Sequence, residues 1–500
     1  MPTAFEAQFL HAVHYLELAA IADDRYENDN DEITAVQKLF NEEWPNIEAG
    51  QTFVSAHSAH DEDMATLCSD YSDYATHLID LCLHPVDRIR WRQAALKAAD
   101  ALSDRRAVAS HAINLGNTHL QIAKFERAIE HFKQAQSIYQ ELKDEEGKGK
   151  VLSGLATAYN FLGKSRLAIR SYRQALDIAL AAGNARAECH ILGNLGTAQL
   201  DAGNPRQAIK SFEQSLTKAR ETNDRIAEGN ALGNLGNAMA LTGNVGRAIQ
   251  YHEEELQIIR ELGNRGGEGS VLSNLGMAHL LLGATKKAIK LFTQALTILK
   301  ETGDKLNESN TLGNLGNAYY ALKDFDRAIE RFQLKLKLDR EMGDLRGEGT
   351  VMGNLGGIYL SMDKPRQALK FLRKGLDIAR QTDNAYGEEV ILGNLGVAYS
   401  DLGQSKRALI CYEEKLKIAR QIGHRDGEGT ALYNLGLERH KLGKLAEAIE
   451  CGEEALSILK EIEAPDVDKV RDKVALWHKE QNNWLASKST GRRSGTVGDK

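Results

Sequence analysis

The chain has 500 residues, of which 42% are hydrophobic, 27% are charged and only 6% are aromatic. It contains 44 Gly but only 6 Pro, a balance that favours closely packed helices over β-sandwiches or barrels. The net charge of −7 is uneven, because residues 1–103 hold 6 basic and 19 acidic side chains and the remainder is mildly basic. Neither part is basic enough to predict nucleic-acid binding.

The sequence also lacks the signals of secretion and of membrane insertion. No apolar run reaches the roughly 18 residues that span a bilayer. The N-terminal residues carry Glu6 and Glu17 and no basic segment, unlike a signal peptide. The cysteines lie far apart and form no CxxC pair: Cys68, Cys82, Cys189, Cys411 and Cys451. We therefore expect a reduced, cytoplasmic chain without disulfides, structural zinc or a membrane partner.

The first part of the chain differs from the rest in charge and in pattern. Residues 1–63 predict an acidic helical segment, with two helices around an acidic loop at 23–32. Residues 64–103 loosely keep the spacing of the repeats that follow, but Arg88 stands where each repeat has Ala. Because a stacked array must end in polar faces, we expect residues 64–103 to form a degenerate capping hairpin.

Residues 104–463 contain nine copies of a forty-residue unit without insertions. One mark of the unit is Asn-Leu-Gly, which stands in eight of the nine copies. In the ninth copy it is replaced by Gly154-Leu155-Ala156. A second mark is an Ala followed by Ile or Leu, at Ala128, Ala168, Ala208, Ala248, Ala288, Ala328, Ala368, Ala408 and Ala448. A fixed period over this length predicts a repeat array.

Each unit predicts two helices, as residues 225–263 illustrate. Leu232 and Leu235 follow the spacing of one face of a first helix, and Gly243 ends it with a left-handed cap. A second helix then runs to a cap at Gly263. The glycine inside the first helix, Gly236, predicts a close approach of the second helix, since a mid-helix Gly otherwise costs about 1 kcal/mol relative to Ala.

The repeats are followed by a closing element. Residues 464–485 predict a capping helix that places Trp477 and Trp484 over the last repeat. The tail at 486–500 is polar and rich in Gly and Ser, which predicts disorder.

The residues of the repeat resemble the tetratricopeptide repeat (TPR): Leu-Gly in the first helix, Ala at the start of the second and an aromatic four residues later, as in Ala128 and Phe132. The forty-residue spacing is similar to that of LGN/Pins-type adaptors, kinesin light chains and the sensor region of bacterial NB-ARC/STAND regulators. The resemblance implies an all-α, right-handed TPR superhelix (an α-solenoid) that binds proteins without catalysis. Residues 1–50 are similar to the segment that joins the ATPase core to the repeats in those regulators, but the sequence lacks the core itself.

The sequence offers little catalytic or cofactor chemistry. Residues 158–165 approach a phosphate-binding loop only in the ending Gly-Lys-Ser, and they occupy the turn between two predicted helices. His57 and His60 stand beside acidic residues, but this stretch is interpreted as an exposed loop. We expect no cofactor, no metal and no enzymatic activity.

A polar stripe on the first helices is the candidate ligand surface. In TPR proteins this helix lines the concave groove, so the resemblance implies that the stripe faces a bound peptide or partner protein. A carboxamide offers a donor and an acceptor, which suits the backbone of an extended chain. The stripe comprises Asn114, Asn117, Asn194, Asn230, Asn234, Asn237, Asn274, Met277, Asn310, Asn314, Asn317, Asn354, Asn394 and Asn434.

Two interpretations of the stripe stay open. The series that includes Asn114 and Asn234 either contacts a ligand or specifies the stacking of repeats through hydrogen bonds. The residues three positions later vary, from Asn237 to Met277, which favours tuning toward a ligand. A second series of glutamates, among them Glu228 and Glu428, predicts exposed ion pairs with a basic residue three positions earlier.

The sequence therefore predicts a non-catalytic scaffold or adaptor that binds a peptide or partner protein in the groove. The alternative is a sensor or regulatory subunit related to the TPR part of a STAND-type signalling ATPase. The oligomeric state stays open, since a solenoid with polar caps need not self-associate.

Overall fold

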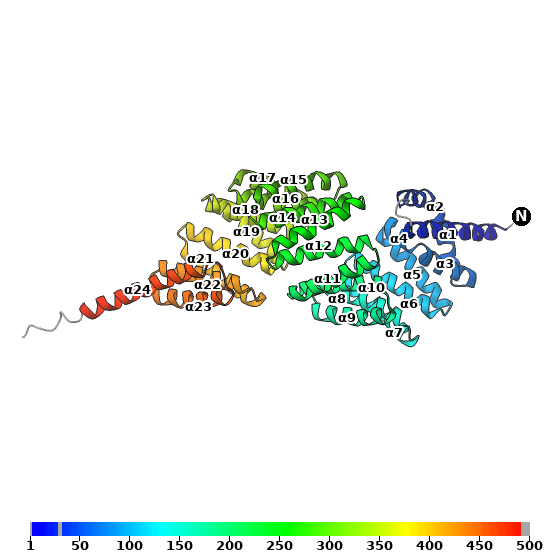
Figure 1. Ribbon diagram of the computed structural model, residues 1–500, viewed down its shortest axis with the longest axis horizontal. Helices are drawn as coiled ribbons and strands as arrows, with labels where there is room; N and C mark the ends of the chain where they lie inside the picture. The colour runs from blue at the N-terminus through cyan, green and yellow to red at the C-terminus, as the bar shows by residue number, and fades with distance from the viewer. Residues whose placement is uncertain (1–2, 29–32, 492–500) are drawn as a thin grey trace, which may run out of the picture. The chain divides into compact units, whose positions relative to one another are not determined.

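The computed structural model describes residues 3–28 and 33–491, and every regular element in these ranges is an α-helix (Figure 1). Helix pairs follow one another along the chain, which confirms the expected all-α solenoid fold. The chain divides into two compact units, Met1–Ile258 and Ile259–Lys500, which are described separately.

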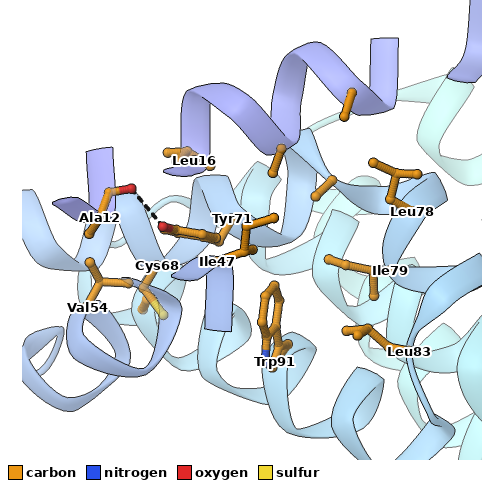
Figure 2. Close-up of a cluster of buried hydrophobic side chains, with 14 of the residues drawn as sticks. Ala12, Leu16, Ile47, Val54, Cys68, Tyr71, Leu78, Ile79, Leu83 and Trp91 are labelled. Atoms are coloured by element: carbon orange, nitrogen blue, oxygen red, sulfur yellow. Dashed lines mark hydrogen bonds between the residues drawn. The ribbon is translucent and has the colours of Figure 1, made fainter. Parts of the chain in front are cut away.

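The first unit begins with helices that enclose a hydrophobic core of their own. The hydroxyl of Tyr71 donates a hydrogen bond of 2.7 Å to the carbonyl of Ala12 (Figure 2). The rings of Trp44 and Trp91 stack with centroids 5.2 Å apart. Part of the expected acidic loop, residues 29–32, lies outside the described residues. The helices of this segment are α1 (Ala4–Asn28), α2 (Ile33–His57), α3 (Glu62–Tyr74), α4 (Thr76–Cys82) and α5 (Pro85–Ala101).

The repeats follow as helical hairpins, whose first and second helices are called A and B here. Residue positions are counted from the first residue of each A helix. In the first unit the pairs are α6 (Arg105–Gln121) with α7 (Phe125–Glu141), α8 (Glu145–Phe161) with α9 (Ser165–Ala182), and α10 (Ala185–Asp201) with α11 (Pro205–Glu221), followed by α12 (Arg225–Leu241). Helix α13 (Val245–Glu261) crosses the division between the units.

The second unit continues the same pattern and ends on a longer helix. Its pairs are α14 (Arg265–Leu281) with α15 (Thr285–Thr302), α16 (Lys305–Ala321) with α17 (Phe325–Met342), α18 (Leu345–Ser361) with α19 (Pro365–Gln381), α20 (Ala385–Asp401) with α21 (Ser405–Ile422), and α22 (Arg425–Lys441) with α23 (Leu445–Glu461). The closing helix is α24 (Val467–Gly491), which continues beyond the predicted end at 485. Residues 492–500 lie outside the described range.

The turns between these helices adopt the left-handed conformation that the sequence predicts. Gly243 has a φ of 79° and Gly263 a φ of 67°. Lys323, which like Ala123 and Lys143 departs from the Gly, Asn and Asp of the other turns between repeat helices, takes the same conformation with a φ of 58°. The geometry of the array therefore overrides the local preference of Lys323 for negative φ.

The glycines inside the A helices make room for a ring of the B helix. A Cβ atom at Gly116 would lie 2.7 Å from Cε1 of Phe132, and one at Gly276 would lie 2.6 Å from Cε1 of Phe292. The predicted close approach is confirmed, and the aromatic side chains lie directly against the glycines. At Gly236 the ring of His252 takes this place.

The A helices of neighbouring repeats pack on one another within each unit, as α10 does on α8 and α12 and as α20 does on α18 and α22. The B helices pack on the A helices of their own and the following repeat. Ion pairs join successive B helices, such as Arg220–Glu254 at 3.2 Å between α11 and α13. Each unit therefore has an A layer and a B layer, with the asparagine stripe on the A layer.

Candidate functional site

The structure places the whole predicted stripe on A helices, at positions six, ten and thirteen. The exposed members are Asn194, Asn230, Asn237, Asn310 and Asn317. The half-buried members are Asn114, Asn117, Asn234, Asn274, Met277, Asn314, Asn354, Asn394 and Asn434. Successive positions follow the spacing of one helix face, so each A helix presents its members on one side.

The side-chain amides of the stripe make no hydrogen bond within the described part of the chain. Asn114 contributes only its backbone carbonyl, which accepts hydrogen bonds from Arg92 and Thr118. The structure therefore contains no hydrogen bond of the kind that the stacking interpretation of the Asn114 series requires. A ligand role for these carboxamides stays a prediction.

A cavity of about 480 Å³ lies beside the stripe in the first unit. It is bounded by α6, α8, α9 and α10, and Asn114, Asn117 and His190 line it. Gly154 also lines it, at the position where eight of the nine repeats carry Asn. Gly154 is therefore a local departure from the repeat. It lies at the larger of the two cavities beside the stripe.

The second unit holds a related cavity of about 230 Å³ between α18, α19 and α20. Asn354 lines it, together with Tyr386 and Arg346. Most of its lining residues stand five repeats after a residue that lines the larger cavity, such as Gly349 after Gly149 and Ile378 after Ile178. The two cavities therefore occupy the same place in the repeat.

Most glutamates of the series are buried, and Glu308 and Glu388 are half-buried, so the prediction that these carboxylates are exposed is wrong. Glu228 accepts hydrogen bonds from Arg220 at 2.7 Å and from Arg225 at 2.6 Å. Burial raises the pKa of Glu228, but the hydrogen bonds from the two arginines outweigh it and lower the pKa overall. Five glutamates of the series pair with an arginine eight residues earlier, at the end of helix B. The sequence predicted only the basic residue on the same helix as the glutamate, so this arginine was missed.

Two further buried charge clusters lie in the second unit, one within the repeat of α16 and α17 and one where α20 and α21 meet the start of α22. The Nζ atom of Lys335 lies 3.2 Å from Asp339 and also donates to Ser309 at 2.9 Å. The Glu389 carboxylate, which is fully buried, is held by Lys415 and by His424. Buried charges need such partners, and these clusters satisfy each other within the repeat stack.

A Ser-His-Asp arrangement joins the N-terminal helices to the first repeat. Nε2 of His111 lies 2.8 Å from Oγ of Ser69, and Nδ1 lies 3.4 Å from Oδ1 of Asp73. Burial, followed by the nearby Arg92, lowers the pKa of His111 to about 4. Ser69 is only 6% exposed and His111 is fully buried, so no substrate can reach the hydroxyl in this conformation. The arrangement holds α3 against α6.

The remaining candidates have structural roles. Residues 158–165 form the end of α8, a turn and the start of α9. Asp61 caps α3 by accepting a hydrogen bond from the backbone of Met64. Among residues 3–28 and 33–491, no three His, Cys, Asp or Glu side chains converge as a metal site would require. No helix in these ranges is long and apolar enough to cross a membrane.

The comparisons with known proteins agree with the repeat pattern. Models of the tetratricopeptide repeat match residues 112–142, 144–221, 227–301, 307–381 and 387–461. No curated protein matches the chain.

Several solved structures are similar in fold. The apo form of RapI is 14% identical with a TM-score of 0.53, over 72% of this chain and 99% of that chain. The apo form of the quorum sensor NprR from B. thuringiensis is 15% identical with a TM-score of 0.52, over 71% of this chain and 99% of that chain. A STAND protein with a tetratricopeptide repeat sensor from Pyrococcus horikoshii is 19% identical with a TM-score of 0.51. That match covers 73% of this chain and 55% of that chain.

Proposed function

The chain belongs to the tetratricopeptide repeat family, and we propose that it is a regulatory scaffold that binds a peptide or a partner protein along its A layer. The observation that carries the proposal is the row of side-chain amides without hydrogen-bond partners, of which Asn237 and Asn317 are exposed. Each amide can donate and accept, so the row matches the alternating groups of a peptide backbone.

The identities of the residues along the stripe support selectivity as well as affinity. Met277 replaces the asparagine of the neighbouring copies, and Leu437 occupies the same position in the last repeat. Backbone hydrogen bonds give affinity for an extended chain, and side-chain contacts at a few positions select its sequence. A partner would therefore be recognised by its extended conformation and by apolar side chains at a few points.

A regulatory role is supported by the structures of similar fold, which include a quorum sensor and a signalling ATPase with a repeat sensor. This likeness supports the alternative that the chain is the sensor or regulatory subunit of a STAND-type ATPase. The two readings differ in the partner: a scaffold recovers client proteins, whereas a sensor subunit recovers an ATPase whose hydrolysis rate it changes.

Affinity purification with three forms of the chain tests the proposal. The first is the wild type, and the second carries Asn237→Ala, Met277→Ala and Asn317→Ala on the A layer. The third is a matched control that carries Gln214→Ala, Gln294→Ala and Gln333→Ala at exposed positions of B helices. We expect the A-layer variant alone to lose a specific partner while its circular dichroism stays helical. Equal recovery by all three forms would contradict the proposal.

A further inference from the structure

The cavity of the first unit is larger than its counterpart, and it lies where the repeat lacks a side chain. Gly154 replaces the asparagine of position ten, and the cavity measures about 480 Å³ against about 230 Å³ beside Asn354. Cavities of roughly 300–1,000 Å³ are typical of ligand sites. The larger cavity falls in this range, and the smaller one does not.

The walls of the larger cavity combine an apolar floor with a polar edge. Ile113, Ile178 and Ile191 contribute to the floor, and small alanines of α9 extend it. Asn114 and Asn117 lie on the α6 side, and their amides have no hydrogen-bond partner among the described residues. Unpaired amides beside an apolar surface fit a ligand that has an apolar body and an adjoining amide.

The charges at the edge of the cavity cancel. The Nζ atom of Lys150 lies 2.9 Å from Oε1 of Glu146, and both residues line the cavity. A charged side chain would lose its hydration in this cavity without gaining a free counter-ion, which is unfavourable. A neutral side chain of large apolar area gains most from the same walls.

We propose that this cavity is the anchor point for the ligand, holding one large aromatic side chain of an extended peptide while Asn114 and Asn117 bond to the peptide groups beside it. The inference rests on the proposed function and deepens it, because it names the class of side chain that is bound and the repeat that binds it. The repeat at 345–391 holds a smaller side chain at the equivalent place.

A small probe measures binding in the cavity separately from the contacts made by the rest of the ligand. N-acetyl-5-fluorotryptophan amide carries an aromatic ring between two amides, and its binding is followed by ¹⁹F NMR. The variant Ala182→Leu fills the cavity with the residue that the chain itself uses at Leu142 and Leu262. The matched control, Thr222→Leu, introduces the same residue at the equivalent place of the next repeat, outside the cavity.

We expect the probe to bind to the wild type and to the control with the same affinity, and to bind at least tenfold more weakly to Ala182→Leu. Asn117→Ala should weaken the binding of the amide probe. It should leave the binding of 3-methylindole, which has no amide, unchanged. A five-residue peptide with tryptophan at its centre should bind more tightly than the amide, because it adds backbone hydrogen bonds.

Three results would overturn the inference: no binding by the wild type, equal binding by Ala182→Leu, or weaker binding of the peptide than of the free amide. The last result would identify a free aromatic compound as the occupant. Each of these three results is compatible with the proposed function if the A-layer variant still fails to recover the partner. Binding of the probe without any partner-protein loss from that variant would instead contradict the proposed function.

Discussion

The fourth residue of most A helices is a glutamate, and in α12, α14, α18 and α22 basic side chains hold this glutamate from two directions. Glu428 accepts hydrogen bonds from Arg420 at 2.8 Å and from Arg425 at 2.6 Å, and Arg420 also pairs with Glu454 on the next B helix. The carboxylate is buried while the arginines are about half exposed. One carboxylate therefore joins the end of one repeat to the start of the next.

Removing this charge should loosen the end of the array. Burial acts to raise the pKa of Glu428, but the hydrogen bonds from Arg420 and Arg425 lower it overall, so the stabilisation is present at neutral pH and is lost as the pH falls through the lowered pKa. We expect Glu428→Gln to lower the local free energy of unfolding by about 1–2 kcal/mol, given the exposure of the arginines. Hydrogen exchange of α22 and α23 measures it, and the exposed Glu450→Gln should have no effect.

The buried His111 makes the junction between α3 and α6 sensitive to acid. Burial and then Arg92 lower the pKa of His111 to about 4, while Asp104 acts in the opposite direction. Below its ordinary value of 6.5, the unfolded chain takes up a proton that the folded chain excludes, so stability falls with pH until about pH 4. Between pH 7 and pH 5 the loss should be about 2 kcal/mol.

Hydrogen exchange of peptides from α3 and α6 at the two pH values measures this loss, after correction for the intrinsic exchange rate. The variant His111→Gln cannot titrate but can still hydrogen-bond to Ser69. Its stability difference between pH 7 and pH 5 should be smaller by the same amount. A pH dependence that is identical in the variant and the wild type would refute the assignment.

At the scale of the helix, a glycine inside an A helix and a glycine on the surface should respond oppositely to alanine. A Cβ atom at Gly236 would lie 2.5 Å from Cε1 of the buried His252, whereas a Cβ atom at Gly246 would have no neighbour within 4 Å. Overpacking of this kind lowers the free energy of unfolding by about 1–3 kcal/mol. Replacing a helical glycine by alanine where there is room raises it by up to about 1 kcal/mol.

We therefore expect Gly236→Ala to lower the thermal stability of its repeat and Gly246→Ala to leave it unchanged or raise it. Differential hydrogen exchange over α12 and α13 gives both values from one pair of experiments. Stabilisation by Gly236→Ala would show that the ring of His252 can move, and it would remove the packing reason for these glycines.

Helix α24 closes the array by placing one tryptophan on the last repeat. Trp477 is fully buried, its ring stacks on that of His440, and a Cβ atom at Gly452 would lie 2.9 Å from its Cζ3. Trp484, on the same helix, is 54% exposed. The two tryptophans therefore differ in burial, although the sequence predicted both to cover the last repeat.

Trp477→Ala should destabilise α23 and α24 by about 3–5 kcal/mol, the range for a large buried side chain. Trp484→Ala should change the same quantity by less than about 0.5 kcal/mol, as an exposed substitution does. Local hydrogen exchange distinguishes the two variants. A similar loss in both would mean that Trp484 also covers the last repeat.

The fold could be predicted at the level of elements because the signal repeats every forty residues. The glycine at most turns and the alanine at each B helix marked the helix ends directly, and Gly243 and Gly263 occupy the expected left-handed turns. Contacts between distant residues left no such signal. Ser69 and His111, which are 42 positions apart, carry no shared pattern that would predict their hydrogen bond.

The candidate site was predictable only in part. The period located the stripe that contains Asn237 and Asn317, since one helix face is fixed by spacing alone. The cavity depends on the shape left between four helices, so Gly154 was visible as a break in the series but not as the origin of a cavity. The sequence did not predict the burial of the glutamates, because a partner such as Arg220 belongs to a different helix from Glu228.

At the scale of the whole molecule, the account holds that ligand binding belongs to the A layer. The B layer carries ion pairs that join repeats. The A helices carry the carboxamides that have no partner among the described residues, and they line both cavities described above together with a B helix. A ligand that used the B layer would compete with the contacts that hold the repeats together.

Site-specific photo-cross-linking tests this claim most directly. A photoreactive amino acid is placed at Asn194 or Asn237 on the A layer of the first unit, or at Gln174 or Gln214 on its B layer, all of which are exposed. The captured partner is then identified by mass spectrometry. We expect the same partner to be cross-linked from both A-layer positions and from neither B-layer position. Cross-linking from the B layer alone would contradict the account.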